Sequence, residues 1–470
     1  METTSIDTDY LVVGSGASAM GFVDTLLDES DCDVVMVDRH AQPGGHWNDA
    51  YPFVRLHQPS AFYGVNSREL GDGRIDTGGL NKGLRELASG AEVLHHFDQV
   101  MRQRFLPSGR VRYFPLSEYS CDGNGAHKVT SLLGEKKKVV NVRKKLVNAA
   151  LINTAVPSTS PPRYHIAEGV ECIPPNGLTK IRHAYPQYVV VGAGKTGMDA
   201  CTWLLQNDVP PSCIHWIRPR DAWLLDRANI QPDPAFFKQF IGSLKTQFEA
   251  MAAASSIPDL FERLEAAGQL LRIDESVTPT MYHCATVSQA ELTELRRIQN
   301  VVRLGHVKAI EKGRIDLDKG SIPIDPNALV IDCSAYGISP LPDVPVFERG
   351  KVNILMVRTC QPAFSAAMIG FVESHFTDEA EMNALCRAVP MPMVPMDWLR
   401  MWAAFLGNRQ RWGKHENLMN WISRSRLDGI SAIVGSIKDG ETDKQVLFQE
   451  YRKSIGPGVE NLMKLLAANR

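Results

Sequence analysis

The residues best suited to chemistry in this chain of 470 residues lie in two glycine-rich turns of the same type. The first turn reads Gly14-Ser15-Gly16-Ala17-Ser18-Ala19, and the second reads Gly192-Ala193-Gly194-Lys195-Thr196-Gly197. In such a turn the first glycine permits the bend and the second lets the backbone approach a pyrophosphate. The small third residue lets the following helix pack on the sheet. The chain is therefore predicted to bind two dinucleotides.

The flanks of the first turn support this prediction. An apolar strand is expected at 11–13, a helix at 19–28 and a second strand at 33–37. That strand ends at Asp38, which follows Gly14 by 24 residues and precedes Arg39. This is close to the spacing expected of a carboxylate that binds the ribose of a dinucleotide.

The second turn has a different partner residue. A strand is expected at 188–191, a helix reaching about Gln206, and a strand at 214–217. The last strand ends in Arg218-Pro219-Arg220 instead of an acid. Guanidinium groups can hold a 2′-phosphate that a carboxylate would repel, so NADPH is favoured over NADH. The alternative is that both arginines lie on a solvated loop.

Two nucleotides in one chain are most often brought together to pass a hydride from a nicotinamide to a flavin. The predicted cofactors are therefore FAD, at the first turn, and NADPH, at the second.

The segment 41–70 carries three further motifs. They are Gly44-Gly45-His46-Trp47, then Arg55-Leu56-His57-Gln58-Pro59, then Val65-Asn66-Ser67-Arg68-Glu69. In these motifs the chain resembles the class B flavin monooxygenases, the group of flavin-containing, Baeyer–Villiger and N-hydroxylating monooxygenases. The resemblance covers about residues 8–70, 185–225 and 325–375. The chain departs from the group in two ways: 173–183 lacks its F-x-G-x-x-x-H fingerprint, and its ATG linkers are degenerate at 147–151 and 330–337.

The resemblance implies a set of flavin contacts. It places Gly45, His46, Trp47, His57 and Gln58 at the FAD. It also implies a last FAD contact at Gln361 and Ser365, where a helix N-terminus can stabilise negative charge on the reduced ring.

The reaction implied by the resemblance is monooxygenation of a small-molecule N, S or carbonyl centre through a flavin C4a-hydroperoxide. Asn66 would donate a hydrogen bond near flavin N5. His46 and His57 are candidate proton donors or neighbours of the flavin ring, because imidazole titrates in the working pH range. For His57 a buried structural role is the alternative.

Two other functions stay open. A flavin reductase or oxidase of an imine, enone, quinone or amine would share every motif except a need for Asn66. A redox-dead scaffold that keeps FAD for its structure is the weaker alternative, because the second nucleotide site carries its arginine pair.

Composition narrows the remaining classes. The net charge is −2, which gives no field to attract nucleic acid or a membrane. No leader and no apolar run of transmembrane length is apparent, so a cytoplasmic location is expected. The basic residues 136–138 and 143–145 are expected on the solvated side of a hairpin. The nine cysteines form no C-x-x-C pair and suit a reducing compartment as mainly small core residues, and the histidines show no metal-ligand spacing.

The predicted fold is α/β, with two Rossmann-like domains, a helical insertion and a helical C-terminal region. Residues 1–180 form the first part of the FAD domain, with a helix at 79–104 and strands across 110–155. Residues 181–325 form the NADPH domain, with a helical insertion at 230–300 over the active-site cleft. Residues 326–376 return to the FAD domain, and 377–470 are helical. Strands near 301–312 and 328–333 are expected to lead back into the FAD sheet.

The C-terminal region is rich in methionine and tryptophan. The sequence MPMVPM at 391–396 is followed by Trp398, Trp402, Phe405 and Trp412. These side chains are expected to form core or a homo-oligomer interface, and the alternative is an apolar pocket for the substrate.

Overall fold

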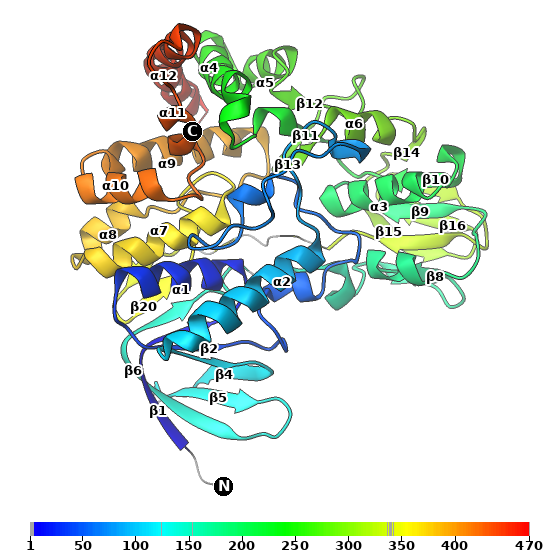
Figure 1. The fold of residues 1–470 in the computed structure, drawn as a ribbon. Coiled ribbons are helices and arrows are strands. Elements are labelled where there is room, and N and C mark those ends of the chain that lie inside the picture. Colours follow the sequence, from blue (N-terminus) through cyan, green and yellow to red (C-terminus); the bar gives the residue numbers. More distant parts are fainter. Residues whose placement is uncertain are drawn as a thin grey trace.

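The computed structural model describes residues 4–123, 125–152, 154–335, 337, 341 and 343–469. Three regions surround a common centre (Figure 1): a first sheet that carries the N-terminus, a second sheet that carries α3, and a stack of helices that includes the C-terminus. The predicted α/β class is confirmed.

The first sheet has a parallel centre in the order β20-β6-β1-β2-β3. Its strands are β1 (Thr4–Val13), β2 (Val34–Val37), β3 (Val111–Phe114), β6 (Lys137–Asn148) and β20 (Lys351–Asn353), with β19 (Phe347–Glu348) at the edge and the hairpin β4 (Ser117–Cys121) and β5 (His127–Ser131) paired to β6. The predicted strands at 11–13, 33–37 and 110–155 are confirmed. The helices of this region are α1 (Ala17–Glu29), α2 (Gly90–Val100) and α7 (Pro362–His375).

Helix α1 packs closely on α7, although the two lie more than 300 residues apart in the sequence. A Cβ atom at Gly370 of α7 would lie 2.9 Å from the carbonyl oxygen of Phe22 in α1. The small residue therefore brings the return segment of the chain against the helix that follows the first glycine turn.

The helix predicted at 79–104 is right only for its second half. Gly79 and Gly83 have φ values of +68° and +84°, which interrupt a helix, and α2 begins after Ser89. Ser89 and Glu92 form a capping box that fixes this start. After α2 the chain continues as a π-helical turn at Met101–Phe105.

The second sheet is parallel in the order β14-β10-β9-β18-β8 and packs against α3 (Lys195–Gln206). Its strands are β8 (Glu171–Ile173), β9 (Tyr188–Val191), β10 (Ile214–Ile217), β14 (Asn300–Val302) and β18 (Leu329–Asp332). A smaller sheet beside it contains β7 (His165–Ile166), β15 (Val307–Glu311), β16 (Arg314–Leu317) and β17 (Gly320–Pro323).

The prediction that strands near 301–312 and 328–333 return to the first sheet is wrong. β18 pairs with β9 and β8 of the second sheet, and the chain re-enters the first sheet at β20. An apolar run indicates a buried strand but does not tell which of two parallel sheets it joins. The boundaries proposed at 180 and 326 remain a prediction, but strand pairing assigns β7, β8 and β18 to the second region.

The predicted helical insertion contains α4 (Phe237–Ala253), α5 (Ile257–Ala266) and α6 (Gln289–Leu295). The sequence analysis missed a small sheet beside these helices. It is made of β11 (Ala222–Asp226), which lies just before the predicted insertion, and of β12 (Leu270–Leu271) and β13 (Met281–Val287), which lie within it. Short 3-10 turns lie at 45–48, 60–62, 79–81, 106–108, 157–159, 175–180, 211–213, 227–229 and 234–236.

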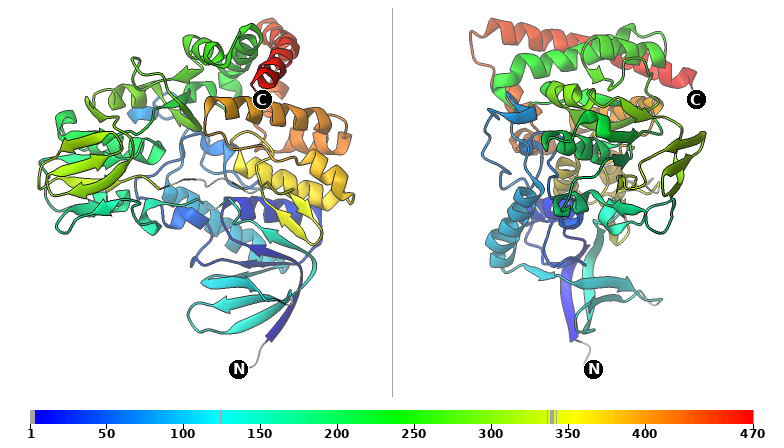
Figure 2. Two further views of the ribbon diagram at one scale, coloured as in Figure 1. Left: turned by 180° about the vertical axis from the view of Figure 1, so that it is seen from behind. Right: turned by 90° about the vertical axis from the view of Figure 1, so that its right-hand side faces the viewer.

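The C-terminal region is helical, as predicted. Its helices are α8 (Glu379–Leu385), α9 (Pro395–Trp412), α10 (Glu416–Arg424), α11 (Ile430–Gly435) and α12 (Thr442–Ala468). Helix α12 packs along α4 of the insertion, at the top of both views in Figure 2. Among the described residues, no helix combines the length and the apolar character needed to cross a bilayer.

Candidate functional site

One large cavity, of about 1210 Å³, lies where the three regions meet. This exceeds the usual size of a site for one small ligand, which is about 300–1,000 Å³. The cavity runs past most of the predicted flavin contacts to the C-terminal helices. The predicted site residues in its lining are Gly14, Gly16, Ala17, Asp38, Arg39, Gly45, His46, Trp47, His57, Gln58, Lys195 and Gln361.

The first glycine turn exposes backbone to this cavity. Gly14 has a φ of +104°, which favours glycine, and α1 begins three residues later at Ala17. A Cβ atom at Gly16 would lie 3.5 Å from the Cα atom of Gly45. The two glycines thus bring bare backbone together at the N-terminus of α1, the arrangement that suits a phosphate. Ser15 and Ala19 are fully buried behind the turn.

Asp38 is held tightly at the end of β2. Its Oδ2 atom accepts hydrogen bonds from the backbone N–H of Ser15 at 2.5 Å and from the Ser15 hydroxyl at 2.8 Å. Its Oδ1 atom accepts the backbone N–H of His40 at 2.8 Å and lies 2.9 Å from Nδ1 of the same residue. Burial acts to lower the pKa of His40, but its hydrogen bonds to Asp49 and Asp38 outweigh burial and raise this pKa.

The Gly44–Trp47 segment forms a tight turn beside the first glycine turn. Gly44 and Gly45 have φ values of +132° and +56°. His46 stacks on Trp47 with ring centroids 5.3 Å apart, and the Trp47 indole N–H donates to the Tyr63 hydroxyl at 2.8 Å. These contacts fix two aromatic surfaces at the wall of the cavity.

His46 and His57 are neutral imidazoles in this structure. Burial lowers the pKa of His46 to about 4. Burial, followed by the positive charges of Lys195 and Arg227, lowers the pKa of His57 to about 3. The expectation that these side chains titrate in the working pH range is therefore wrong. The buried Nδ1 atom of His57 has no hydrogen-bond partner in the described part of the chain.

The second glycine turn has the geometry of the first. Gly192 has a φ of +136°, and a Cβ atom there would lie 2.5 Å from the carbonyl oxygen of Cys333, just after β18. A Cβ atom at Gly197 would collide with the carbonyl oxygen of Gly192. A Cβ atom at Gly194 would meet no described atom within 4 Å, so this glycine faces open space at the start of α3.

Of this turn, only Lys195 reaches the main cavity. Gly192, Gly194, Thr196 and Gly197 lie outside its lining. The two degenerate linker segments lie against the two glycine turns in the same way. Residues 148–150 lie beside Gly14, and residues 332–333 lie beside Gly192.

The two arginines after β10 differ sharply. Arg218 is 2% exposed and forms an ion pair with Asp221. Its guanidinium carbon lies 4.7 Å from the ring centroid of Trp216. Arg220 is exposed. The solvated-loop alternative therefore does not describe Arg218, and Arg220 is the arginine free to meet a phosphate from solvent.

At the last predicted flavin contact, the two candidates have different positions. Gln361 caps α7 and lines the cavity, and its buried Oε1 atom lacks a described hydrogen-bond partner. Ser365 lies outside the lining and is 1% exposed. Its hydroxyl accepts the backbone N–H groups of Val357 and Arg358 at 3.1 and 3.3 Å, so it shapes the loop before α7.

Asn66 is not brought to the cavity. Its Oδ1 atom accepts a hydrogen bond from the Ser425 hydroxyl at 2.9 Å, in the segment after α10. The structure therefore gives Asn66 a contact between two loops, whereas His46 and His57 line the cavity.

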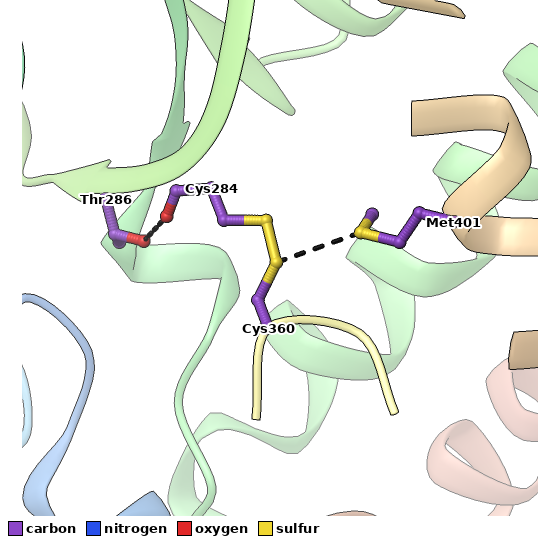
Figure 3. Close-up of a disulfide and its surroundings, with 4 residues drawn as sticks. All are labelled: Cys284, Thr286, Cys360 and Met401. Carbon is purple, nitrogen blue, oxygen red and sulfur yellow. Dashed lines mark hydrogen bonds between the residues drawn. A yellow bond between two sulfur atoms is a disulfide. The ribbon is translucent and has the colours of Figure 1, made fainter. Parts of the chain in front are cut away.

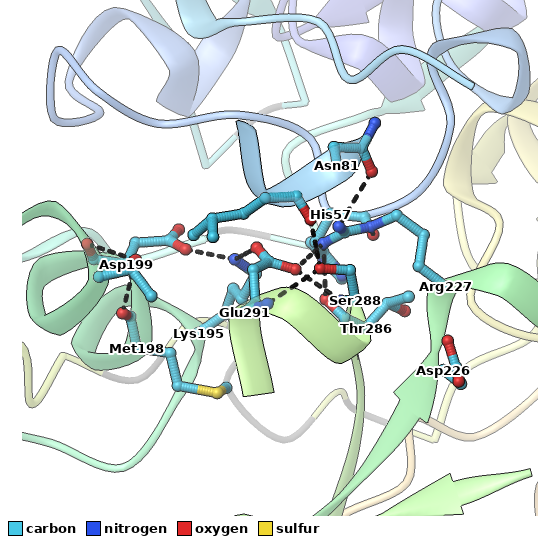
Figure 4. A network of polar contacts seen from close by, with 12 residues as sticks. His57, Asn81, Lys195, Met198, Asp199, Asp226, Arg227, Thr286, Ser288 and Glu291 are labelled. Carbon is cyan, nitrogen blue, oxygen red and sulfur yellow. Dashed lines mark hydrogen bonds and ion pairs between the residues drawn. The ribbon is translucent and has the colours of Figure 1, made fainter. Parts of the chain in front are cut away.

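A buried polar network between the two nucleotide regions was missed by the sequence analysis (Figure 4). Arg227 is fully buried, forms an ion pair with Glu291 at 2.6 Å and donates to the carbonyl oxygen of His57 at 3.0 Å. Glu291 lies 3.6 Å from Lys195, which pairs with Asp199. One residue of this network, Glu291, has a signal in the sequence, because Ser288-Gln-Ala-Glu291 has the pattern of a capping box.

The far end of the cavity is apolar. Trp398, Trp402 and Phe405 of α9 line it together with Met391 and Met401, and Phe240 and Leu244 of α4 face the same space. The ring centroids of Trp398 and Trp402 are 5.8 Å apart. Trp412 instead donates its indole N–H to the carbonyl oxygen of Leu385 and belongs to the core. The pocket interpretation of the methionine and tryptophan residues thus holds for part of the set.

The cysteines also differ from expectation. Cys284 of β13 and Cys360 before α7 form a disulfide, and both residues line the cavity. The other seven cysteines are free. The pair is separated by 76 residues, so a rule based on local spacing could not detect it.

Comparisons with known proteins agree with this architecture. No model of a known protein family matches the chain. The uncharacterised protein Rv2000 of Mycobacterium tuberculosis is 49% identical over 464 residues, which are 99% of this chain and 85% of that protein. The uncharacterised protein Mb2023 of Mycobacterium bovis matches equally well.

Two solved structures share the fold across nearly the whole chain. A polycyclic ketone monooxygenase from the fungus Thermothelomyces thermophila has a TM-score of 0.52 and 12% identity, with 97% of this chain and 89% of that chain covered. A cyclohexanone monooxygenase from Rhodococcus sp. Phi1, bound to NADP⁺, has a TM-score of 0.50 and 14% identity, with 97% and 99% covered. The chain therefore belongs to the family of the mycobacterial protein Rv2000, and it has the fold of the class B monooxygenases that its motifs resemble.

Proposed function

We propose that this protein is an FAD-dependent, NADPH-consuming oxidoreductase, and specifically a monooxygenase of a small-molecule N, S or carbonyl centre. The observation that carries the proposal is a single cavity that joins the first glycine turn, Lys195 of the second turn and an aromatic wall. This wall is formed by Trp398, Trp402 and Phe405. A flavin site, a nicotinamide site and an apolar substrate site need this adjacency.

The residues present fit FAD. A Cβ atom on Gly45 would lie 2.9 Å from the Cα atom of Gly16, so the two turns leave bare backbone where a pyrophosphate needs close approach. Asp38 offers a carboxylate at the ribose position. The orphaned Oε1 of Gln361 and Nδ1 of His57 are buried polar atoms that need a partner, and both residues line the cavity.

When bound, FAD would take a hydride from NADPH and react with dioxygen, and the protein must position the groups and exclude water. The neutral imidazoles of His46 and His57 can orient a partner by hydrogen bonding. They do not serve as a store of protons at neutral pH, because their pKa values lie near 4 and 3. The aromatic wall favours a substrate with an apolar body.

Consumption of NADPH in air and under argon tests the proposal. A monooxygenase consumes NADPH with substrate in air and stops under argon after its flavin is reduced. A protein that consumes NADPH under argon with an imine, enone or quinone present is a reductase. A protein that consumes no NADPH in either atmosphere, and whose flavin is not bleached by an amine under argon, is a scaffold, and this result would contradict both catalytic functions.

The second candidate is an FAD-dependent reductase or oxidase without oxygen insertion. One observation favours it: Asn66, which the resemblance places near flavin N5, contacts Ser425 outside the cavity lining.

Replacement of Asn66 tests this point directly. We expect Asn66→Ala to keep FAD and to release no more hydrogen peroxide per NADPH than the wild type, because the amide lies outside the cavity. Ser425→Ala, which removes the same hydrogen bond from the other side, is the matched control. A several-fold rise in peroxide with Asn66→Ala alone would place the amide at the flavin and restore the role that the resemblance implies.

A further inference from the structure

The disulfide between Cys284 and Cys360 lies inside the candidate active site. Both cysteines line the same cavity as Gly16, Trp47 and Gln361. Cys284 is 7% exposed, and Cys360 is only partly buried. A disulfide that only stabilised the fold would not need to face this cavity.

The bridge joins two parts of the molecule that come from different regions (Figure 3). Cys284 belongs to β13 of the insertion, whereas Cys360 lies in the loop between β20 and α7, next to the residue that caps α7. Their Cα atoms are 6.5 Å apart. The Cys360 sulfur also lies 3.8 Å from the Met401 sulfur of α9, so one link touches the insertion, the return segment and the C-terminal helices.

The backbone at both cysteines is unusual. Among the described residues, five that are not glycine have a positive φ, and two of them are Cys284 at +54° and Cys360 at +49°. Such a conformation is strained for a residue with a side chain, and it is typical of functional sites. The surrounding structure thus holds both cysteines where their side chains meet.

From this placement we propose that Cys284 and Cys360 are a redox-active pair that accepts two electrons from the flavin of the same cavity. The inference rests on the proposed FAD and NADPH dependence. The S–S bond is cleaved and two S–H groups form, which takes two electrons and two protons. One NADPH supplies a hydride through the flavin and becomes NADP⁺, and solvent supplies the second proton. The Cys360 thiol formed in this step would lie near the positive end of the α7 dipole, which favours later loss of its proton.

The number of titratable thiols provides the test. FAD-loaded protein is mixed under argon with NADPH, quenched in acid, denatured and alkylated with N-ethylmaleimide. Seven alkylated cysteines are expected before NADPH, with a linked Cys284–Cys360 peptide, and all nine afterwards. Titration should need about two NADPH per chain to bleach the flavin fully, because the first equivalent reduces the disulfide.

Two variants sharpen the test. Cys360→Ser should bleach with about one NADPH and show no change in thiol number. Cys121→Ser, which removes an exposed free thiol, should keep the gain of two thiols and the demand for a second equivalent.

Two results would overturn the inference. One is that the linked peptide persists after NADPH has bleached the flavin, and the other is that the oxidised protein contains no linked peptide. A colourless protein, or a flavin that NADPH does not bleach, would instead reject the proposed function itself, and with it this electron route. The visible spectrum distinguishes that failure from a failure of the cysteine pair.

Discussion

Arg218 and Arg220 lie two residues apart but have different surroundings. Arg218 is buried between the Trp216 ring and Asp221, and Asp221 is also bound by Arg303 at 2.9 Å. Arg220 is exposed. A phosphate that arrives from solvent can therefore be met by Arg220 without breaking a buried ion pair.

We predict that Arg220→Ala lowers the affinity for NADPH roughly ten- to hundredfold and leaves the affinity for NADH unchanged. A charge-assisted hydrogen bond to phosphate contributes about 1.5–3 kcal/mol, which corresponds to this range. Titration of both nucleotides by fluorescence gives the two affinities. Arg218→Ala is the comparison: it should lower the melting temperature instead. If Arg218→Ala alone abolished the preference for NADPH, the buried arginine would be the phosphate ligand.

The buried imidazole of His57 should make the stability depend on pH. Its pKa in the folded chain is about 3, below the ordinary value near 6.5. Between these values the unfolded chain binds more protons, so the free energy of unfolding rises with pH and is lost as the pH falls from about 6.5 towards 3. We predict a loss of up to about 2 kcal/mol from this group between pH 7 and pH 5.

Melting temperatures of the wild type and His57→Gln at pH 7 and pH 5 measure this contribution. The variant should lose less stability than the wild type on acidification. His95→Gln, at an exposed position of α2, should behave like the wild type. Identical acid sensitivity of His57→Gln and the wild type would show that His57 is not held neutral by burial.

At the scale of elements, the glycine turns were predictable because their function depends on the backbone. A strand, a bend that needs positive φ and a helix start leave a direct trace in the sequence, and both turns have this geometry at Gly14 and Gly192. The acid at the end of β2 was found for the same reason, since its spacing follows from the length of α1.

The elements that were mispredicted depend on contacts between distant residues. The apolar pattern of β18 is the same whichever sheet it joins, and its pairing with β9 is set by the fold as a whole. The disulfide and the ion pair of Arg227 with Glu291 join residues 76 and 64 positions apart, beyond any local spacing rule. The position of Asn66 beside the flavin was inferred from the family resemblance. That resemblance does not specify how the C-terminal helices of this chain pack, and here the segment after α10 contacts Asn66.

The first turn offers a prediction at the same scale. Gly16→Val should yield a colourless apoprotein, because a branched side chain would fill the space between Gly16 and the backbone of Gly45, 3.5 Å away. The ratio of flavin to protein absorbance measures the loss. Gly78→Ala is the control, since a Cβ atom there meets no described atom within 4 Å and should leave the flavin content unchanged. A fully loaded Gly16→Val protein would mean that the cofactor lies elsewhere.

The cavity is formed by the molecule as a whole, because its lining combines residues of the two regions that contain the large sheets with residues of the C-terminal helices. A buried ion pair joins these parts. Arg358, in the loop before α7, donates to Oδ1 of Asp428 at 2.6 Å and to its carbonyl oxygen at 3.0 Å. Both residues are no more than 5% exposed. Arg358 also lines the cavity, and its guanidinium carbon lies 4.6 Å from the ring centroid of Phe364. This ion pair therefore fixes the segment after α10 to the loop before α7, which lines the cavity where the flavin is predicted to bind.

We predict that Asp428→Asn destabilises the protein by about 3–5 kcal/mol, because it leaves the charge of Arg358 buried without a counter-ion. Flavin should also be released at a lower temperature, since the loop that carries Arg358 forms part of the cavity. Chemical unfolding followed by far-UV circular dichroism and by flavin fluorescence measures the two effects separately. Asp443→Asn removes an exposed partner of Lys238 and should cost less than about 1 kcal/mol. Adding Arg358→Met to Asp428→Asn should restore part of the loss, because no unpaired charge then stays buried. If the single variant unfolded like the wild type, the C-terminal helices would be held on the cavity by apolar packing alone.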